Sequence, residues 1–120
     1  MIAVLRSVCD AVQGKGGKDY KRRSSSWPKV RKEHMRTHRN CAACERYKKR
    51  HMLEVHHITP FHVAPESELD PDNLITLCRR CHLLLGHLNN WKLVNPSIIW
   101  DAQALLKSIQ HARRLHEPVQ

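Results

Sequence analysis

The chain has 120 residues, enough for one domain with a modest hydrophobic core, and only 5% of them are aromatic. No run of 18 or more apolar residues occurs in it, which excludes a transmembrane helix. Of the formal net charge of +10, a balance of +8 lies in residues 1–40, which indicates either a polyanion partner or a basic surface that only keeps the protein soluble.

The first segment, residues 1–25, is expected to be a flexible, basic N-terminal arm. It contains GKGGK and leads into a run of serines, both typical of loops. Its opening, MIAVLRSVCDAVQ, has an arginine in the middle, so it is not expected to be a secretory signal. The densest positive stretches are KDYKRR in this arm and ERYKKR further on. Weak nucleic-acid contacts are expected from six of their residues, Lys21, Arg22, Arg23, Lys48, Lys49 and Arg50.

The first helix is expected in the sequence SSWPKVRKEHMRTH. Ser26 is a candidate N-cap, and Pro28 suits the first turn. Trp27, Val30 and His34 recur at the spacing of one helical face. This helix leads directly into the first of two Cys-x-x-Cys pairs.

Four of the five cysteines form two pairs, Cys41 with Cys44 in CAAC and Cys78 with Cys81 in CRRC. A two-residue spacing allows both thiolates of a pair to reach one tetrahedral ion at about 2.3 Å. A redox role would not explain two such pairs, and a small basic chain without a signal peptide argues against disulfides. The pairs therefore predict one structural zinc ion, whereas Cys9 is expected to be a buried apolar residue.

The 33 residues between the two pairs exceed the usual 15–20, so a further element is inserted there. A strand is expected at about 52–58, ended by Thr59-Pro60, and a second strand, LITL, is expected before CRRC. The long loop between them carries four carboxylates that we expect to be solvated, those of Glu66, Glu68, Asp70 and Asp72. Two adjacent imidazoles, His56 and His57, lie at the end of the first strand, where folding alone gives no reason for them.

Helical patterns follow the second pair. The first is CRRCHLLLGHL, from which two histidines are expected to project towards the hairpin, and the second is expected at about 97–114. The second has one apolar face for docking, formed by Ile98, Ala102, Leu105, Ile109 and Ala112. Because aromatic residues are scarce, the three tryptophans are expected in the core rather than as base-stacking platforms, namely Trp27, Trp91 and Trp100.

These motifs together resemble the HNH endonucleases, also called ββα-metal nucleases. The resemblance covers residues 27–91 and lies in CAAC, LEVHHITP, DPDNLITLCRRCH and LLLGHLNNW, and it is especially clear for the small HNH proteins of bacteriophages and prophages. It implies an α+β fold, with a zinc-stapled, treble-clef-like ββα-metal core at about residues 41–91. N- and C-terminal helices flank this core in a single nuclease domain over residues 26–120.

The resemblance also implies a role for each matching residue. His56 and His82 are expected to bind a catalytic divalent ion. His87 is the natural third ligand, although a spacing of five residues from His82 suits one face of an α-helix poorly. His57 is expected to be the general base that deprotonates water. Asn73 is expected to orient the loop or the base through hydrogen bonds.

Elementary chemistry agrees with these roles. A neutral imidazole with a pKa near 6.5 suits a general base, and a divalent ion with open positions stabilises the phosphate and the leaving oxygen. Strand neighbours point to opposite faces, so a bend at Thr59-Pro60 would be required to bring His56 and His57 to one edge.

The expected function is that of a divalent-metal-dependent endonuclease that nicks or cuts DNA, most simply duplex DNA. The expected cofactors are a structural Zn²⁺ and a catalytic Mg²⁺, Mn²⁺, Ni²⁺ or Zn²⁺. The expected location is the cytoplasm of a bacterial host, without membrane contact, and other phage DNA-packaging proteins are candidate partners. Two alternatives stay open: a non-catalytic zinc-dependent nucleic-acid-binding module, which the intact histidines argue against, and a nuclease for structured RNA. Sequence specificity, pathway and oligomeric state stay open as well.

Overall fold

The computed structural model describes residues 22–46, 49 and 52–118. The expected arm therefore lies almost wholly outside the described residues, and so do Cys9 and three of the expected nucleic-acid contacts, Lys21, Lys48 and Arg50. Within the described part of the chain, no helix is both long enough and apolar enough to cross a membrane.

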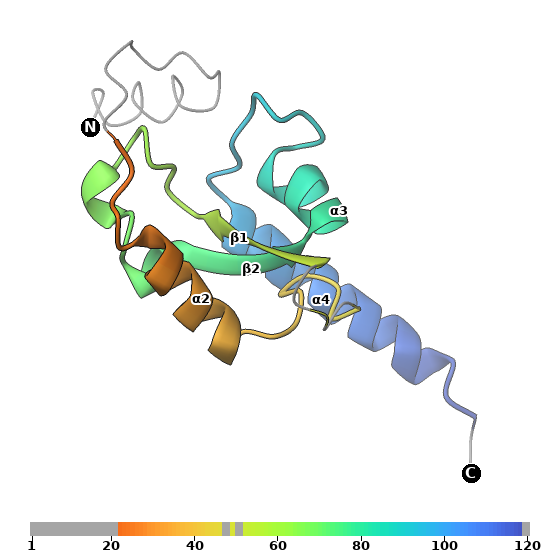
Figure 1. Cartoon of the computed structure of the whole chain (residues 1–120). Helices are drawn as coiled ribbons and strands as arrows, with labels where there is room; N and C mark the ends of the chain where they lie inside the picture. The colour runs from red at the N-terminus through yellow and green to blue at the C-terminus, as the bar shows by residue number, and fades with distance from the viewer. Residues whose placement is uncertain (1–21, 47–48, 50–51, 119–120) are drawn as a thin grey trace.

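A two-stranded antiparallel sheet lies at the centre of the fold. Strand β1 (Leu53–His57) pairs with strand β2 (Leu74–Cys78), with His57 opposite Leu74. All five residues of β2 are buried. Alternate residues of a strand point to opposite faces, so burial of every residue requires cover on both faces. Helices on the two sides of the hairpin provide this cover (Figure 1).

The helix expected in SSWPKVRKEHMRTH is confirmed as α2 (Trp27–Thr37), which lies on one side of the sheet. Pro28 occupies the first turn, where its missing N–H leaves no intrahelical bond unmade. Ser26 precedes the helix, but its side chain makes no capping hydrogen bond. His34 and Met35 are the buried residues of α2, and Met35 belongs to the hydrophobic core.

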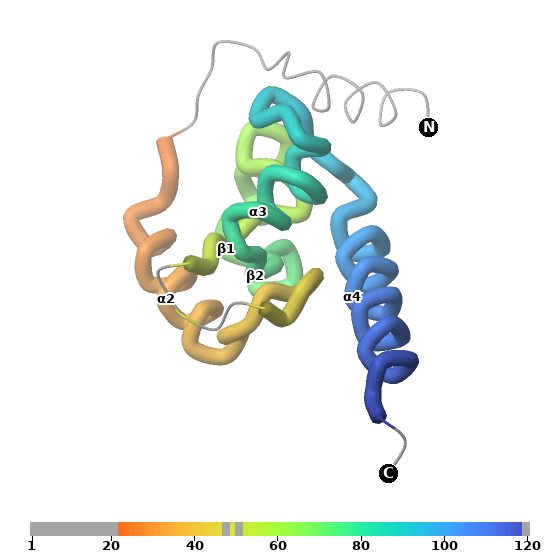
Figure 2. The backbone as a smooth tube through the Cα atoms, turned by 90° about the vertical axis from the view of Figure 1, so that its right-hand side faces the viewer, coloured from red at the N-terminus to blue at the C-terminus, as the bar shows by residue number. Residues whose placement is uncertain are grey.

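The other side of the sheet is covered by a short composite helix. It begins as α3 (Arg79–Cys81) and continues as η4 (His82–Gly86), which is a π-helical turn. Helix α4 (Ile98–Leu115) is close to its predicted bounds and packs against η4 (Figure 2). Only the first part of its predicted apolar face is buried, at Ile98 and Ala102, and the helix is exposed from residue 111 onward.

The predicted α+β fold, with a ββα core between two flanking helices, is thus confirmed. Aliphatic side chains and cysteines fill its small core, among which Leu77, Ile98 and Cys41 are almost completely buried. The expectation of core tryptophans is wrong for Trp91 and Trp100, which are 51% and 75% exposed, because the strands and the cysteines already fill the interior.

The loop between the strands is less solvated than predicted. Asp70 and Asp72 are exposed, and the Asp70 carboxylate accepts a hydrogen bond from the Asp72 backbone N–H at the start of the 3₁₀ turn η3 (Pro71–Asn73). The expectation is wrong for Glu68, which is only 3% exposed. The Glu68 carboxylate accepts a hydrogen bond from the backbone N–H of Ser24. It also forms an ion pair with the guanidinium of Arg23, at a distance of 3.4 Å. Glu68 therefore ties this loop to the segment that leads into α2.

Candidate metal centres and the surrounding site

The structure brings the four paired cysteines together. Their Sγ atoms all lie within 4.8 Å of one another, and those of Cys44 and Cys78 are 3.9 Å apart. Four sulfurs at about 2.3 Å from a tetrahedral zinc ion would lie about 3.8 Å from each other. None of the four takes part in a disulfide. The arrangement therefore fits a single structural zinc ion held by Cys41, Cys44, Cys78 and Cys81.

The electrostatics of this cluster disfavour several thiolates together unless a cation is bound. Burial, followed by the charge on Cys41 and the contact with Cys78, raises the pKa of the Cys81 thiol far above its usual range. A dication at the centre removes this repulsion and allows every sulfur to bind as thiolate. The Sγ of Cys78 also accepts a hydrogen bond from the backbone N–H of Cys81 at 3.5 Å, which holds the two residues of this pair together.

Three imidazoles, one from β1 and two from the segment that follows Cys81, form a second cluster. Nδ1 of His56, from β1, lies 3.0 Å from Nε2 of His82, which begins η4. Nε2 of His87, directly after η4, lies 3.2 Å from the same atom. Three nitrogens bound at about 2.0–2.1 Å in tetrahedral geometry would lie about 3.3 Å apart. The cluster therefore fits one divalent ion, with further positions left for water or a phosphate oxygen.

The π-helical turn explains how His87 reaches this cluster. In an α-helix, residues three or four apart share a face, so a spacing of five places two side chains on different faces. A π-helical turn has i→i+5 hydrogen bonds, which bring residues five apart into line. The objection to His87 from its spacing therefore does not apply to this backbone.

Hydrogen bonds orient two of the three rings. Nδ1 of His82 lies 2.6 Å from Oε2 of Glu54, and Nδ1 of His87 lies 2.7 Å from the backbone oxygen of Leu93. Both acceptors require a proton on Nδ1, so the lone pair of each ring is on Nε2, facing the centre of the cluster. Glu54 was not identified from the sequence as a site residue. The available signal was its position two residues before His56, on the same face of the strand.

The environment of His56 keeps its ring neutral. Burial, followed by the charges of His82 and His87, lowers its pKa to about 3. Among the described residues, its one polar contact is the nitrogen of His82, and its Nε2 is buried without a hydrogen-bond partner. Three close nitrogens with lone pairs repel one another, and a bound cation would turn this repulsion into coordination.

Gly86 provides the space in which these rings meet. A Cβ atom at this position would lie 3.1 Å from Cδ2 of His82 and 3.3 Å from Cε1 of His56. Both distances are shorter than ordinary van der Waals contact between carbons. Any other residue at position 86 would therefore push the rings of the cluster apart.

His57 has different neighbours from His56. β1 stays paired with β2 as far as His57. Among the described residues, the rings of His56 and His57 share no hydrogen-bond partner and no ring contact. The bend that was expected to bring the two rings to one edge is therefore not seen in this part of the strand. The His57 ring is buried against Trp27, with the ring centroids 4.4 Å apart. Its Nε2–H donates to the backbone oxygen of Glu68 at 2.9 Å, which leaves the lone pair on Nδ1. Burial lowers its pKa, so the ring is neutral at pH 7.

Asn73 fastens the end of β1 to the loop. Its Oδ1 accepts a hydrogen bond from the backbone N–H of Thr59 at 2.7 Å. Its Nδ2 donates to the backbone oxygens of Thr59 and Ser67, at 3.0 and 3.1 Å. The side chain is buried, so it acts through these backbone contacts. It fixes both the residues that follow His57 and the loop that carries Glu68, the acceptor of the His57 hydrogen bond.

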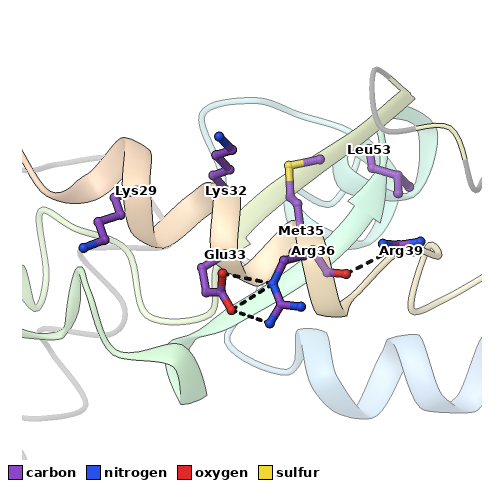
Figure 3. Close-up of a pocket in the computed structure, with 7 residues that line it drawn as sticks. All are labelled: Lys29, Lys32, Glu33, Met35, Arg36, Arg39 and Leu53. Atoms are coloured by element: carbon purple, nitrogen blue, oxygen red, sulfur yellow. Dashed lines mark hydrogen bonds and ion pairs between the residues drawn. The ribbon is translucent and has the colours of Figure 1, made fainter.

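A basic face extends along α2. A hollow of about 690 Å³ is lined by four cations together with Met35, Leu53 and Glu33, the cations being Lys29, Lys32, Arg36 and Arg39. Figure 3 shows that Glu33 pairs with Arg36, at 2.7 Å, whereas Lys29 and Lys32 extend away from this pair. Lys29 and Lys32 are therefore available to bind anions.

The expected nucleic-acid contacts that the structure describes differ in their surroundings. Arg22 and Lys49 are exposed. Arg23 is partly occupied within the fold, because it pairs with Glu68 and its guanidinium lies 4.8 Å from the centre of the Phe61 ring. The guanidinium of Arg23 is therefore less available to an external anion than the ammonium groups of Lys29 and Lys32 on α2.

Comparison with known proteins gives one match. Residues 41–95, which contain both clusters, the hairpin, Asn73 and the composite helix, match the family model described as HNH endonuclease. No curated protein and no solved structure matches the chain significantly.

Proposed function

Because residues 41–95 match the HNH endonuclease family model, we propose that this protein is a divalent-metal-dependent endonuclease that hydrolyses phosphodiester bonds in DNA. The observation that carries the proposal is the convergence of three imidazole nitrogens, from His56, His82 and His87, beside a separate, buried and neutral His57. A structural zinc site alone would explain the cysteines but neither of these features.

In this proposal each histidine of the cluster binds the catalytic ion through the nitrogen that faces the others. A bound divalent ion would polarise the phosphate and stabilise the leaving oxygen. Glu54 and the backbone oxygen of Leu93 hold two of the rings in the tautomer that can bind. Gly86 leaves the room that the rings require.

His57 is proposed as the general base. Its Nε2 proton is held by the backbone oxygen of Glu68, so Nδ1 is the atom that accepts a proton from the attacking water. The lowered pKa keeps that atom free of a proton at neutral pH. Asn73 contributes as a positioning residue, because it fixes the backbone on both sides of this hydrogen bond.

Phosphate contacts outside the reacting centre are proposed for the basic face of α2, chiefly from Lys29 and Lys32. Such contacts bind duplex DNA without reading its sequence. Residues 26–120 are proposed to act as one domain, since the hydrophobic core includes residues of both flanking helices, Met35 from α2 and Ile98 from α4. Because the sequence resembles phage-encoded proteins, the proposed biological role is DNA packaging inside a bacterial host cell.

A plasmid-nicking assay tests the proposal. Supercoiled plasmid is incubated with the full chain in Mg²⁺, Mn²⁺, Ni²⁺, Zn²⁺ or EDTA, with His57→Ala as the matched control. Nicked or linear plasmid is expected with at least one ion and not with EDTA, and His57→Ala is expected to cleave about 10²–10⁴-fold more slowly. Binding of plasmid without cleavage in every ion would instead identify a non-catalytic nucleic-acid-binding module. Cleavage of a structured RNA but not of plasmid would make RNA the substrate.

A further inference from the structure

Trp91 is an exposed aromatic residue in direct contact with the histidine cluster. Its ring centroid lies 5.3 Å from that of His82 and 4.9 Å from that of His87, in edge-on and tilted geometry. Half of the residue is nevertheless accessible to solvent, at 51%. Contacts with two metal-binding rings therefore hold the indole in place without burying it.

A groove begins beside this indole. It has a volume of about 580 Å³, and its lining includes Met52, Leu83 and Trp91 together with two arginines, Arg79 and Arg80. Met52 is also largely exposed, at 41%. The groove thus combines an aromatic surface and apolar side chains with two guanidinium groups.

Charge in the groove is positive. Arg79 and Arg80 are both exposed, and within the described part of the chain neither has a carboxylate partner or a hydrogen-bond acceptor. The carboxylate that lines the groove belongs to Glu54, and it is already held by His82 at 2.6 Å. An anionic group in this groove would meet two unpaired cations and one carboxylate that is turned towards the histidines.

We propose that this groove is a subsite for one unstacked nucleotide of the substrate, next to the bond that is cut. The base stacks on Trp91, and the phosphate is bound by Arg79 and Arg80. Nucleobases stack on tryptophan independently of their identity, and arginine binds phosphate through paired N–H donors. This inference rests on the proposed nuclease function and adds to it a substrate class, nucleic acid with an unpaired nucleotide at the cleavage site.

The consequence for substrate choice follows from base pairing. A base inside an intact duplex has both faces stacked on its neighbours, so it cannot reach a tryptophan without being unstacked first. A nucleotide in a single strand, a flap or a mismatch needs less energy to do so. Nucleic acid with such a nucleotide is therefore expected to bind more tightly than the corresponding intact duplex.

The test measures binding separately from cleavage. A fluorescein-labelled 12-nucleotide DNA strand, and the same sequence as a duplex, are titrated with the full chain carrying His57→Ala and one equivalent of zinc. Fluorescence anisotropy gives the affinity of each protein for the DNA. The variants compared are Trp91→Ala, Trp91→Phe and the matched control Trp100→Ala, which removes the other exposed indole. Because the histidine site is not loaded with metal, loss of catalytic metal in Trp91→Ala does not affect the comparison.

Trp91→Ala is expected to weaken single-strand binding by about 5- to 150-fold, with a smaller effect on the duplex. Trp91→Phe should retain most of the affinity, and Trp100→Ala should match the starting protein. In Arg79→Gln/Arg80→Gln the log–log salt dependence on the single strand should become shallower by about 0.7, the contribution of the one phosphate that both arginines bind. The subsite is refuted if Trp91→Ala behaves like Trp100→Ala, or weakens duplex and single strand equally. Absence of cleavage in every metal, with the effect of Trp91 intact, would refute the nuclease proposal alone.

Discussion

Nδ1 of His82 lies 2.6 Å from Oε2 of Glu54, although 28 positions separate the two residues in the sequence. β1 therefore supplies both a member of the histidine cluster, His56, and the carboxylate that orients a second member. Carboxylates in this position fix the tautomer of a metal-binding histidine and raise its basicity. The β-hairpin thus determines the orientation of the His82 ring, and with it the direction in which Nε2 of His82 points.

Glu54→Gln is expected to lower the affinity for the catalytic ion about 10- to 100-fold, because an amide lacks the charge that supports the His82 lone pair. Calorimetric titration of the zinc-loaded protein with Ni²⁺ or Mn²⁺ measures this loss. Glu66→Gln, which changes an exposed carboxylate of the inter-strand loop, is the matched control and should bind metal normally. Equal affinities in the two variants would remove Glu54 from the site.

Gly86→Ala tests the space between the rings. The added methyl group would meet His82 and His56 at 3.1 and 3.3 Å, so the rings must separate and the ion should bind roughly tenfold more weakly. The cysteine site should keep its zinc, and the fold should survive. Leu84→Ala, at an exposed position in the same turn, is the control. If Gly86→Ala binds the ion as tightly as Leu84→Ala does, the cluster is looser than described.

His57→Ala and His56→Ala should fail in different ways. Loss of a general base is expected to slow cleavage by about 10²–10⁴-fold while the catalytic ion still binds. Loss of a ligand is expected to weaken metal binding, and high metal concentration should restore part of the activity. Cleavage rates measured over a range of metal concentrations separate the two cases. The roles are reversed if His57→Ala loses the ion and His56→Ala retains it.

The pH dependence of cleavage should reflect the lowered pKa of His57, which burial causes. A base acts only without its proton, so the rate at saturating metal should be constant around neutral pH. It should fall only as the pH drops through the lowered pKa of His57, which lies below the ordinary value of about 6.5. Protons also compete with the ion for its imidazole ligands, so the profile is repeated at several metal concentrations. Acid inactivation that disappears completely at high metal would contradict a base with this pKa.

The basic face of α2 is tested by the salt dependence of duplex binding. Lys29→Gln/Lys32→Gln should make the log–log slope shallower by about 1.8, because each phosphate contact contributes about 0.9. Lys107→Gln/Arg114→Gln removes two exposed cations from α4 and serves as the control. The same slope change in both variants would indicate a general effect of net charge rather than a contact made by α2.

The fold was largely predictable because its signals are local. Cys-x-x-Cys spacing, alternating strand residues and the Ser-x-Pro start of α2 each depend on a few neighbouring residues. The backbone of η4 was not predictable, since HLLLG gives no local sign of a π-helical turn. The position of His87 depends on that turn, so its spacing alone was misleading.

Errors about individual side chains arose where contacts that the local sequence does not specify placed the side chain. Glu68 was expected in solvent because its neighbours in the sequence are polar, but its partners, Ser24 and Arg23, are more than 40 positions away. Trp91 was assigned to the core because aromatic residues are scarce in this chain, but it lies over the histidine cluster. Glu54 was overlooked because its partner, His82, lies on another element. Long-range contacts decided the outcome for Glu68 and Glu54, whereas Trp91 contacts histidines only nine and four positions away.

Cys81 and His82 are consecutive residues, yet they belong to different clusters, one of thiolates and one of imidazoles. Thiolates select zinc strongly, whereas imidazoles accept several divalent ions. With a catalytic ion other than zinc, folding and activity would therefore depend on two different metal supplies. A cell short of zinc would lose the folded protein, and a cell short of the catalytic ion would hold an intact but idle one. Because one peptide bond joins the two clusters, the cysteine that completes the first also fixes where the histidine of the second begins.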